Sequence, residues 1–208
     1  MDGTATIPAR SHNVGRFLAD FRVPMSFVLV MTLIVIEFLF GRPGVLPDST
    51  LLTAPYWGVG CVLLGLFIRT WAAGVLRKGK TLATTGPYSL CRHPLYLGSG
   101  LMVLGFCHLT CDPLFYLPVV CGLAIIYCNT MWCEERRLAM HFPEAWPIYA
   151  LRTPMLLPWN PTRFAPESWS LAQWKTNREY QAAATVMVSL VLLGVWRLLE
   201  ASGQIGAL

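Results

Sequence analysis

The sequence predicts an all-α integral membrane protein, a bundle of about five transmembrane helices. Of its 208 residues, 55% are hydrophobic and only 13% are charged, and the mean hydropathy is +0.51. A soluble domain of this length needs more polar surface. Five apolar runs approach the ~20 residues that a helix needs to cross the bilayer core. These runs cover residues 23–40, 54–76, 95–110, 113–133 and 182–199.

The basic residues predict how these spans are oriented. Thirteen of the sixteen Lys and Arg residues precede the first span, or separate the second from the third or the fourth from the fifth. Because basic loops stay in the cytoplasm, we expect these segments to be cytoplasmic and the C-terminus to lie on the far side. Topology and anionic headgroups account for the net charge of +5, so no nucleic-acid partner is expected.

The sequence has no repeats, low-complexity tracts or linkers, so a single membrane domain, residues 1–208, is expected, and no metal is expected in it. No small-residue cleavage site ends the first apolar run, so it is expected to be a retained anchor. The seven cysteines lie almost entirely in apolar runs and form no C-x-x-C pair. In "CHLTCD" (107–112), the acid before Pro113 is more typical of a helix N-cap than of a metal ligand.

A polar cluster is predicted at the cytoplasmic foot of the third and fourth spans. The D-P pair at 112–113 allows a tight turn, so these spans should form an antiparallel hairpin with arms about 25 to 30 Å long. Arg92 and His93 at one foot then approach Glu134 and Glu135 at the other. Boundary anchoring is the alternative interpretation, but anchors are cations and aromatics rather than acids.

The sequence around this cluster resembles a known family. "TTGPYSLCRHPLYLG" (84–98) followed by "EERRLAMHFPEAWPIYALRTPMLLP" (134–158) resembles the isoprenylcysteine carboxyl methyltransferases, which share this pattern with membrane phospholipid methyltransferases. The resemblance runs from about residue 69 to residue 158. It implies an enzyme with a cytoplasmic S-adenosyl-L-methionine pocket, formed by the third and fourth helices and the segment 134–181. The acceptor, a lipid or lipidated small molecule, would enter from the bilayer.

The resemblance also implies which residues form the site. The implied cofactor-binding positions are Leu82, His93, Tyr96, Gly98, Glu134, Glu135 and His141, and the implied catalytic positions are Arg92, Glu135 and Arg152. The chain departs from the family pattern at three positions. Lys80 stands where a histidine is common, Pro143 replaces a glycine and Trp146 replaces a tyrosine. The last two departures bear on the shape of the turn at 142–149.

The chemistry of these residues suits methyl transfer. Displacement at a sulfonium needs positioning, exclusion of water and charge balance, but no metal or covalent nucleophile. The start of the third helix with Arg92 or His93 suits the carboxylate of the cofactor, and Glu134 or Glu135 suits its ammonium. Two guanidiniums in one pocket, from Arg92 and Arg152, would orient a carboxylate acceptor. We therefore expect a methyl ester of a lipid-like acid.

Three other functions remain open at this point. Phospholipid N-methylation belongs to the same pattern. An NADPH-dependent sterol-type reductase is favoured slightly by Trp146 in "EAWPIY" and disfavoured by R-H-P-x-Y. A non-enzymatic membrane scaffold leaves the cluster of His93 and the two glutamates unexplained.

Some charged and small residues lie outside this pattern. Glu37 and Arg69 fall within apolar runs; we expect Arg69 to snorkel, and Glu37 stays open between pairing and a wet cavity. The glycines of "GVGCVLLG" (58–65) and "GSGLMVLG" (98–105) are expected to serve helix packing, because a nucleotide fingerprint needs another spacing and a flanking strand.

The segment "PTRFAPESWSLAQWKTNREYQ" (161–181) mixes aromatic and basic residues. This composition predicts an interfacial helix that seats the last span. The alternative is that Asn177, Arg178 and Glu179 cap the pocket and help to select the acceptor.

Overall fold

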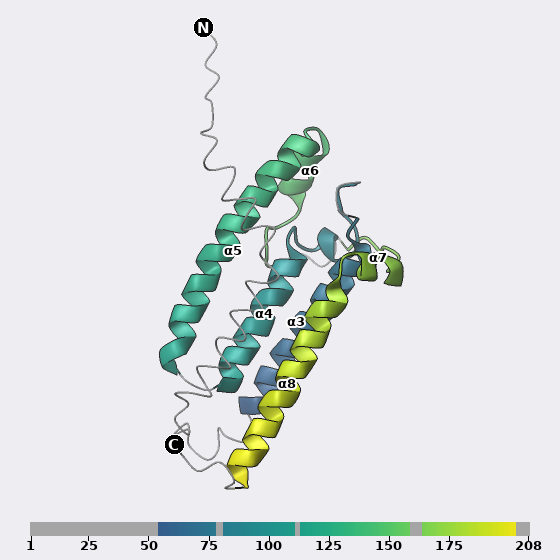
Figure 1. Ribbon diagram of the computed structural model, residues 1–208. Coiled ribbons are helices and arrows are strands. Elements are labelled where there is room, and N and C mark those ends of the chain that lie inside the picture. Colours follow the sequence, from purple (N-terminus) through teal and green to yellow (C-terminus); the bar gives the residue numbers. More distant parts are fainter. Residues whose placement is uncertain (1–53, 78–80, 111–112, 159–163, 203–208) are drawn as a thin grey trace.

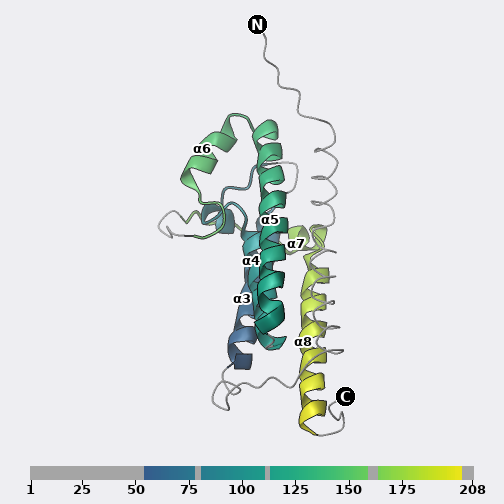
Figure 2. The ribbon, with the colours of Figure 1, turned by 90° about the vertical axis from the view of Figure 1, so that its left-hand side faces the viewer.

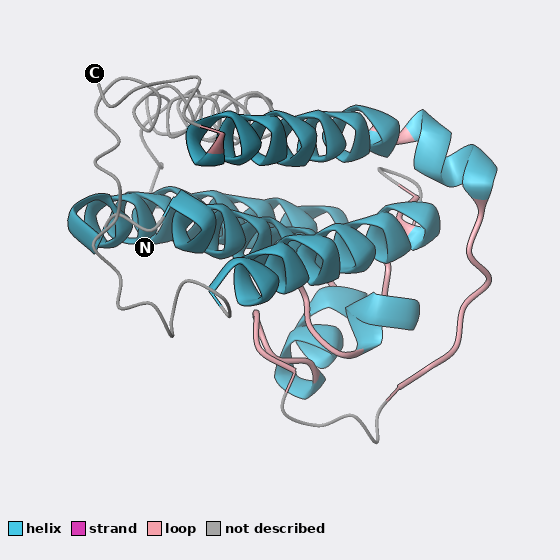
Figure 3. Cartoon of the chain, turned by 90° about the horizontal axis from the view of Figure 1, so that it is seen from below, coloured by secondary structure: helices cyan, strands magenta, loops and turns pink. Residues whose placement is uncertain are grey.

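The computed structural model describes residues 54–77, 81–110, 113–158 and 164–202 (Figure 1). In these residues six α-helices and one 3-10 helix succeed one another, with no strand (Figure 3). They are α3 (Ala54–Val75), η1 (Gly86–Ser89), α4 (Pro94–Thr110), α5 (Pro113–His141), α6 (Ala145–Arg152), α7 (Leu171–Thr176) and α8 (Glu179–Ala201). The all-α class is confirmed for this part of the chain. The first predicted span, with Glu37, lies outside the described residues, as do Lys80 and Asp112.

Four long helices, α3, α4, α5 and α8, run side by side (Figures 1 and 2). At one end of this bundle α3 and α5 finish while α4 and α8 begin. The short elements η1, α6 and α7 gather at the same end (Figure 1). The alternating helix directions therefore bring the polar segments 81–93, 142–158 and 164–178 together.

Glycines make the contact between α3 and α4 the closest in the bundle. A Cβ atom added to Gly98 would lie 2.6 Å from the carbonyl oxygen of Gly65, and one added to Gly105 would lie 2.6 Å from that of Gly58. Real Cβ atoms do not approach backbone oxygens so closely, so the two helices meet backbone to backbone. The expectation that the glycines of both motifs serve helix packing is confirmed for Gly58, Gly65, Gly98 and Gly105. It is wrong for Gly60 and Gly100, where an added Cβ would meet nothing within 4 Å.

Two of the described helices are long and apolar enough to cross a membrane, namely Tyr56–Val75 and Glu179–Leu199, and Pro94–Leu109 is a shorter apolar helix. Only 11% of the apolar window of α8 is buried. Its outward side chains include Met187, Val188, Val191, Leu192 and Leu198, each more than half exposed. An apolar face of this length needs an apolar surrounding, which indicates membrane association.

Helix boundaries agree with the predicted runs where capping residues mark them. The run 54–76 became α3, and α4 and α5 begin at Pro94 and Pro113, where proline suits the first helical turn. The predicted span 113–133 lies within α5, which continues past it to His141 and carries Glu134 and Glu135 on its last two turns. The predicted interfacial helix is shorter than expected, because 164–170 is extended and α7 has only 6 residues.

The segment before α8 binds the end of α3. Asn177 Nδ2 donates to the carbonyl oxygens of Ala73 and Leu76, each at 2.8 Å. The backbone N–H of Ser170 donates to the carbonyl oxygen of Gly74 at 3.1 Å. These bonds satisfy carbonyls that the end of a helix leaves open. They favour the predicted seating role of this segment.

Arg69 does not snorkel, so that expectation was wrong. It is 8% exposed, and its Nε lies 2.5 Å from Oε1 of Glu179 at the start of α8. A buried carboxylate satisfies the guanidinium more directly than the distant headgroups would. The alternative in which Glu179 caps the pocket is not observed, because Glu179 turns towards α3.

Candidate active site

The residues between η1 and α4 are held by the segment that follows α6. The backbone N–H of Arg92 donates to the carbonyl oxygen of Pro154 at 2.8 Å, and that of His93 donates to Met155 at 3.1 Å. The carbonyl of His93 then accepts the N–H groups of Tyr96 and Leu97 and starts α4. Both side chains are therefore fixed at the dipole-positive end of this helix.

Glu135 joins the two feet of the helical hairpin. Its Oε1 lies 2.9 Å from Nη1 of Arg92 and within hydrogen-bond distance of Nε2 of His93, at 3.1 Å. His93 is 4% exposed, while Arg92 and Glu135 are half-buried. Glu134 is half-buried beside them. The predicted approach of Arg92 and His93 to this acidic pair is thus found, with Glu135 as the shared partner.

Aromatic rings surround this ion cluster. Tyr96 packs edge-on against His93 at 5.6 Å between ring centroids, and against Tyr127 of α5 at 5.3 Å. On the other side, the guanidinium of Arg92 lies 5.7 Å from the ring centroid of Trp146. Rings exclude water from the charges, and the π-face of Trp146 attracts the cation. Trp146, which stands where the family pattern has a tyrosine, therefore packs against the guanidinium of Arg92.

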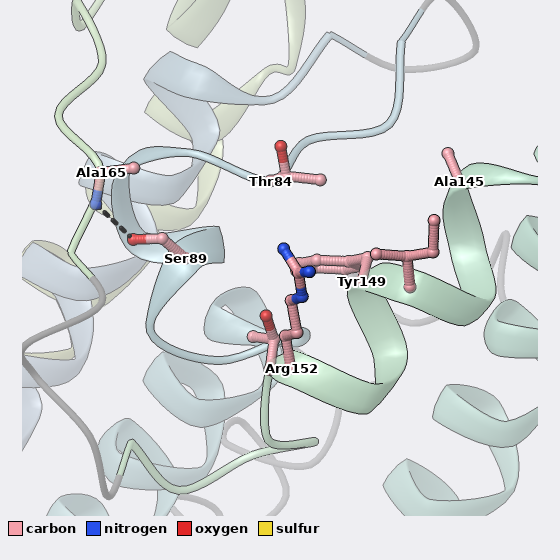
Figure 4. Close-up of a pocket in the computed structure, with 8 residues that line it drawn as sticks. Thr84, Ser89, Ala145, Tyr149, Arg152 and Ala165 are labelled. Atoms are coloured by element: carbon pink, nitrogen blue, oxygen red, sulfur yellow. Dashed lines mark hydrogen bonds between the residues drawn. The ribbon is translucent and has the colours of Figure 1, made fainter.

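A pocket of about 710 Å³ opens beside the cluster, between α6, η1 and the non-helical segment at Ala165. Its lining is mainly apolar, with hydroxyl groups at intervals. The lining residues are Thr84, Ser89, Ala145, Ile148, Tyr149, Arg152, Thr153 and Ala165. Figure 4 shows Arg152 beside the ring of Tyr149, with its guanidinium pointing towards Thr84. Drug-sized ligands occupy pockets of this size.

Tyr149 lines the pocket and also contacts the aromatic ring beside the cluster. Its hydroxyl donates to the carbonyl oxygen of Tyr88 at 2.7 Å, and its ring packs against Trp146. Burial raises the pKa of Tyr149, so the hydroxyl stays protonated and keeps donating. Burial likewise raises the pKa of Cys91 from 9.0 to about 11, which leaves this neighbouring thiol neutral at pH 7. Cys91 is therefore unsuited to be a nucleophile.

The other predicted site residues are Leu82, His141 and Gly98. Leu82 is half-buried on the stretch before η1. His141 is exposed, and its Nδ1 bonds the carbonyl oxygen of Arg137 within its own helix at 2.9 Å. Gly98 faces α3, where its missing side chain admits the backbone of Gly65. The packing of α3 against α4 explains this glycine, and the role of Gly98 in cofactor binding stays a prediction.

Arg152 lines the pocket, and the guanidinium of Arg92 binds Glu135 in the ion cluster. Both residues lie in the polar segments at the same end of the bundle. That the two guanidiniums serve one ligand pocket stays a prediction.

Trp146 and Tyr149 were missed as site residues, although a signal was present. Together with Arg152 they recur every three residues in "AWPIYALR", which places them on neighbouring turns of one helical face. Buried aromatics followed by an arginine on one side of a short helix indicate the lining of a site. No comparable signal marks Thr84, Ser89 or Ala165, which the fold brings together from distant segments.

Comparison with known proteins agrees with this architecture. The family model for phospholipid methyltransferases matches residues 53–145. The cobalt-zinc-cadmium resistance protein CzcN of Cupriavidus metallidurans is 36% identical over 153 residues, which are 71% of this chain and 68% of that protein. The nickel-cobalt-cadmium resistance protein NccN of Alcaligenes xylosoxydans xylosoxydans is 35% identical over 113 residues, 53% of this chain and 51% of that protein.

No solved structure matches the chain. The names of both relatives refer to metal resistance. In the part of this chain that the structure describes, no group of three or more His, Cys, Asp and Glu side chains is placed to hold a metal ion. The family match covers α3, α4 and all of α5, including the foot where Glu135 meets Arg92 and His93. The chain therefore belongs to the phospholipid methyltransferase family.

Proposed function

We propose that this protein transfers a methyl group from S-adenosylmethionine to a lipid-like carboxylic acid at the polar end of its helical bundle. The observation that carries the proposal is the carboxylate of Glu135, shared by Arg92 and His93 at the foot of the hairpin. Cations and acids held together at a buried helix start suit a zwitterionic ligand. Membership of a methyltransferase family supports the reaction type.

The residues of the cluster fit the methionine end of this cofactor. Nε of Arg92 is buried and has no hydrogen-bond partner among the described residues, so one charged donor is available to a carboxylate. Glu135 uses only Oε1 for Arg92 and His93, and its charge suits an ammonium. When bound, the cofactor supplies an electrophilic methyl group on a sulfonium. The chain itself has to orient the two reactants and exclude water.

The pocket beside Tyr149 supports a lipid-like acid as the acceptor. Most of its lining is apolar, and Arg152 brings a planar guanidinium that suits bidentate binding of a carboxylate. A carboxylate attacks without first losing a proton, whereas an ammonium headgroup would need a base. The apolar outer faces of α3 and α8 support an acceptor that arrives through the bilayer. We propose that the polar end of the bundle faces the cytoplasm, as the basic residues predict.

Ligand titration of the detergent-purified chain tests the cofactor. We expect S-adenosylmethionine and S-adenosylhomocysteine to bind and NADPH not to bind. Binding of NADPH alone would replace the methyltransferase with a reductase. Binding of none of the three would favour a scaffold.

The product class is tested separately with membranes and methyl-tritiated cofactor. A methyl ester releases volatile methanol in mild base, and this is the expected outcome. Label that stays fixed in base would identify an N-methylated headgroup and overturn the ester.

A further inference from the structure

A buried ion pair ties three helices together near the candidate active site. Nε of Arg69 on α3 donates to Oε1 of Glu179 on α8 at 2.5 Å, and its Nη2 donates to Oε2 at 3.0 Å. The Nη1 of Arg69 donates to the hydroxyl of Ser99 on α4. We refer to Arg69, Ser99 and Glu179 as the clamp. Because all three guanidinium nitrogens are bonded, the charges tolerate burial.

The clamp reaches the start of α4, which carries the cluster residues. The hydroxyl of Ser99 donates to the carbonyl oxygen of Leu95 at 2.9 Å, and Leu95 lies between His93 and Tyr96. A Cβ on Gly98 would lie 2.7 Å from Cγ of Arg69, so this glycine lets the arginine cross α4. The clamp thus binds α4 at Ser99, which lies within one turn of Tyr96. The ring of Tyr96 in turn packs against His93.

The clamp adds directed bonds to the contact of α3 with α4 at this level. Gly65 and Gly98 meet backbone to backbone, with the side chain of Met102 beside Gly65 and that of Arg69 beside Gly98. Apolar packing depends little on direction, whereas hydrogen bonds depend on it strongly, so the bonds of Arg69 help to fix the rotation of α4 against α3. Since α4 must present His93 to Glu135, its rotation matters to the cluster.

We propose that Glu179 is a positioning residue for the cofactor end of the candidate active site, acting through Arg69 and Ser99 on the start of α4. Glu179 lies beyond residues 53–145, the part matched by the family model. The expected effect on the affinity for S-adenosylmethionine rests on the proposed function. The expected effect on the accessibility of His93 does not, so experiments can test the clamp and the proposed function separately.

The test compares Ser99→Ala and Glu179→Gln with the wild-type chain in detergent. Ser189→Ala is the matched control, because Ser189 is equally buried but lies on α8 away from Arg69. Two measurements need no ligand: the rate at which diethyl pyrocarbonate modifies His93, read by mass spectrometry, and hydrogen exchange of the amides at 94–99. The third measurement is the Kd for S-adenosylmethionine.

We expect both clamp variants to expose His93 to faster modification, to speed exchange at 94–99 and to raise the Kd about tenfold, whereas Ser189→Ala matches the wild type. Unchanged modification of His93 in both clamp variants would overturn the inference. If Glu179→Gln does not fold, Ser99→Ala decides, because it keeps the ion pair. If the wild type binds no S-adenosylmethionine, the proposed function fails, and His93 modification and amide exchange still decide the role of the clamp.

Discussion

At the scale of single residues, Glu135 accounts for Arg92 and His93 beside an apolar run. One of its oxygens holds both side chains, which come from the opposite arm of the hairpin. Anchoring at a membrane boundary would leave the guanidinium of Arg92 pointing to headgroups. The observed geometry instead holds this guanidinium and the buried imidazole of His93 on one carboxylate.

Replacement of Glu135 by Gln should weaken binding of S-adenosylmethionine by roughly 1.5 to 3 kcal/mol, the contribution of a charge-assisted hydrogen bond. The amide keeps the shape but removes the charge that Arg92 and His93 share. Isothermal titration in detergent measures the change. Glu144→Gln is the control, because Glu144 is exposed at the start of α6. Equal affinity in both variants would mean that the cluster only anchors the helix ends.

Replacement of Arg152 by Lys should lower kcat more than it weakens cofactor binding. Lysine keeps the positive charge in the pocket but lacks the planar fork that orients a carboxylate. We expect kcat to fall at least tenfold, while the Kd for S-adenosylmethionine changes by less than about threefold. Arg178→Lys, an exposed arginine on the turn before α8, is the matched control. A loss of cofactor affinity as large as the loss of turnover would place Arg152 at the cofactor instead.

Contacts between side chains were predictable only where helix rise and a short connection set the distance between the two residues. The rise of two helices joined by a tight turn was enough to bring His93 towards Glu135. Arg69 was misread because its partner, Glu179, lies 110 residues away on a helix whose placement no local pattern determines. Burial and exposure look alike in a sequence when an arginine lies near the end of an apolar helix.

At the scale of elements, the glycines of α3 and α4 decide how closely these helices pack. Gly65→Ala and Gly98→Ala should each lower the free energy of unfolding by about 1 to 3 kcal/mol, because the new methyl groups meet backbone atoms that side-chain rotation cannot move. Denaturant unfolding in detergent, followed by tryptophan fluorescence, measures the loss.

Gly60 and Gly100 provide controls in the same two helices. An added Cβ meets nothing within 4 Å at either position. Because alanine is a better helix former by up to about 1 kcal/mol, Gly60→Ala and Gly100→Ala should be neutral or stabilising. A similar loss in all four variants would show that backbone flexibility, not close approach, explains the glycines.

Element types were easier to predict from the sequence than element ends. Pro94 and Pro113 fix where α4 and α5 begin, since proline tolerates the first turn. The apolar run 113–133 does not mark the end of α5, because a helix continues beyond its apolar residues as long as its polar residues favour helix, as those of "EERRLAM" do. The extended segment 164–170 was missed, because its bonds to η1 and to α3 are with distant parts of the chain.

At the scale of the whole molecule, alternating helix directions collect the polar segments at one end of the bundle (Figure 1). The apolar lengths of α3 and α8 lie below them, so the proposed orientation would put the candidate site at the boundary between lipid and water. This arrangement suits an enzyme whose cofactor is charged and whose acceptor is apolar. The basic residues at the same end, such as Arg136 over the ring of Trp132 at 4.2 Å, match the headgroup layer.

The orientation of this bundle in the membrane gives the last prediction. Reporters fused after Lys80 and after Lys175 should be active in the cytoplasm, because α3 ends and α8 begins at the basic end. A reporter fused at Leu208 should be active on the opposite side, since α8 has the length and hydropathy to cross the bilayer once. Paired fusions to a reporter active only in the cytoplasm and to one active only outside it measure both outcomes. Cytoplasmic activity at Leu208 would mean that α8 does not cross the bilayer but lies along its cytoplasmic surface.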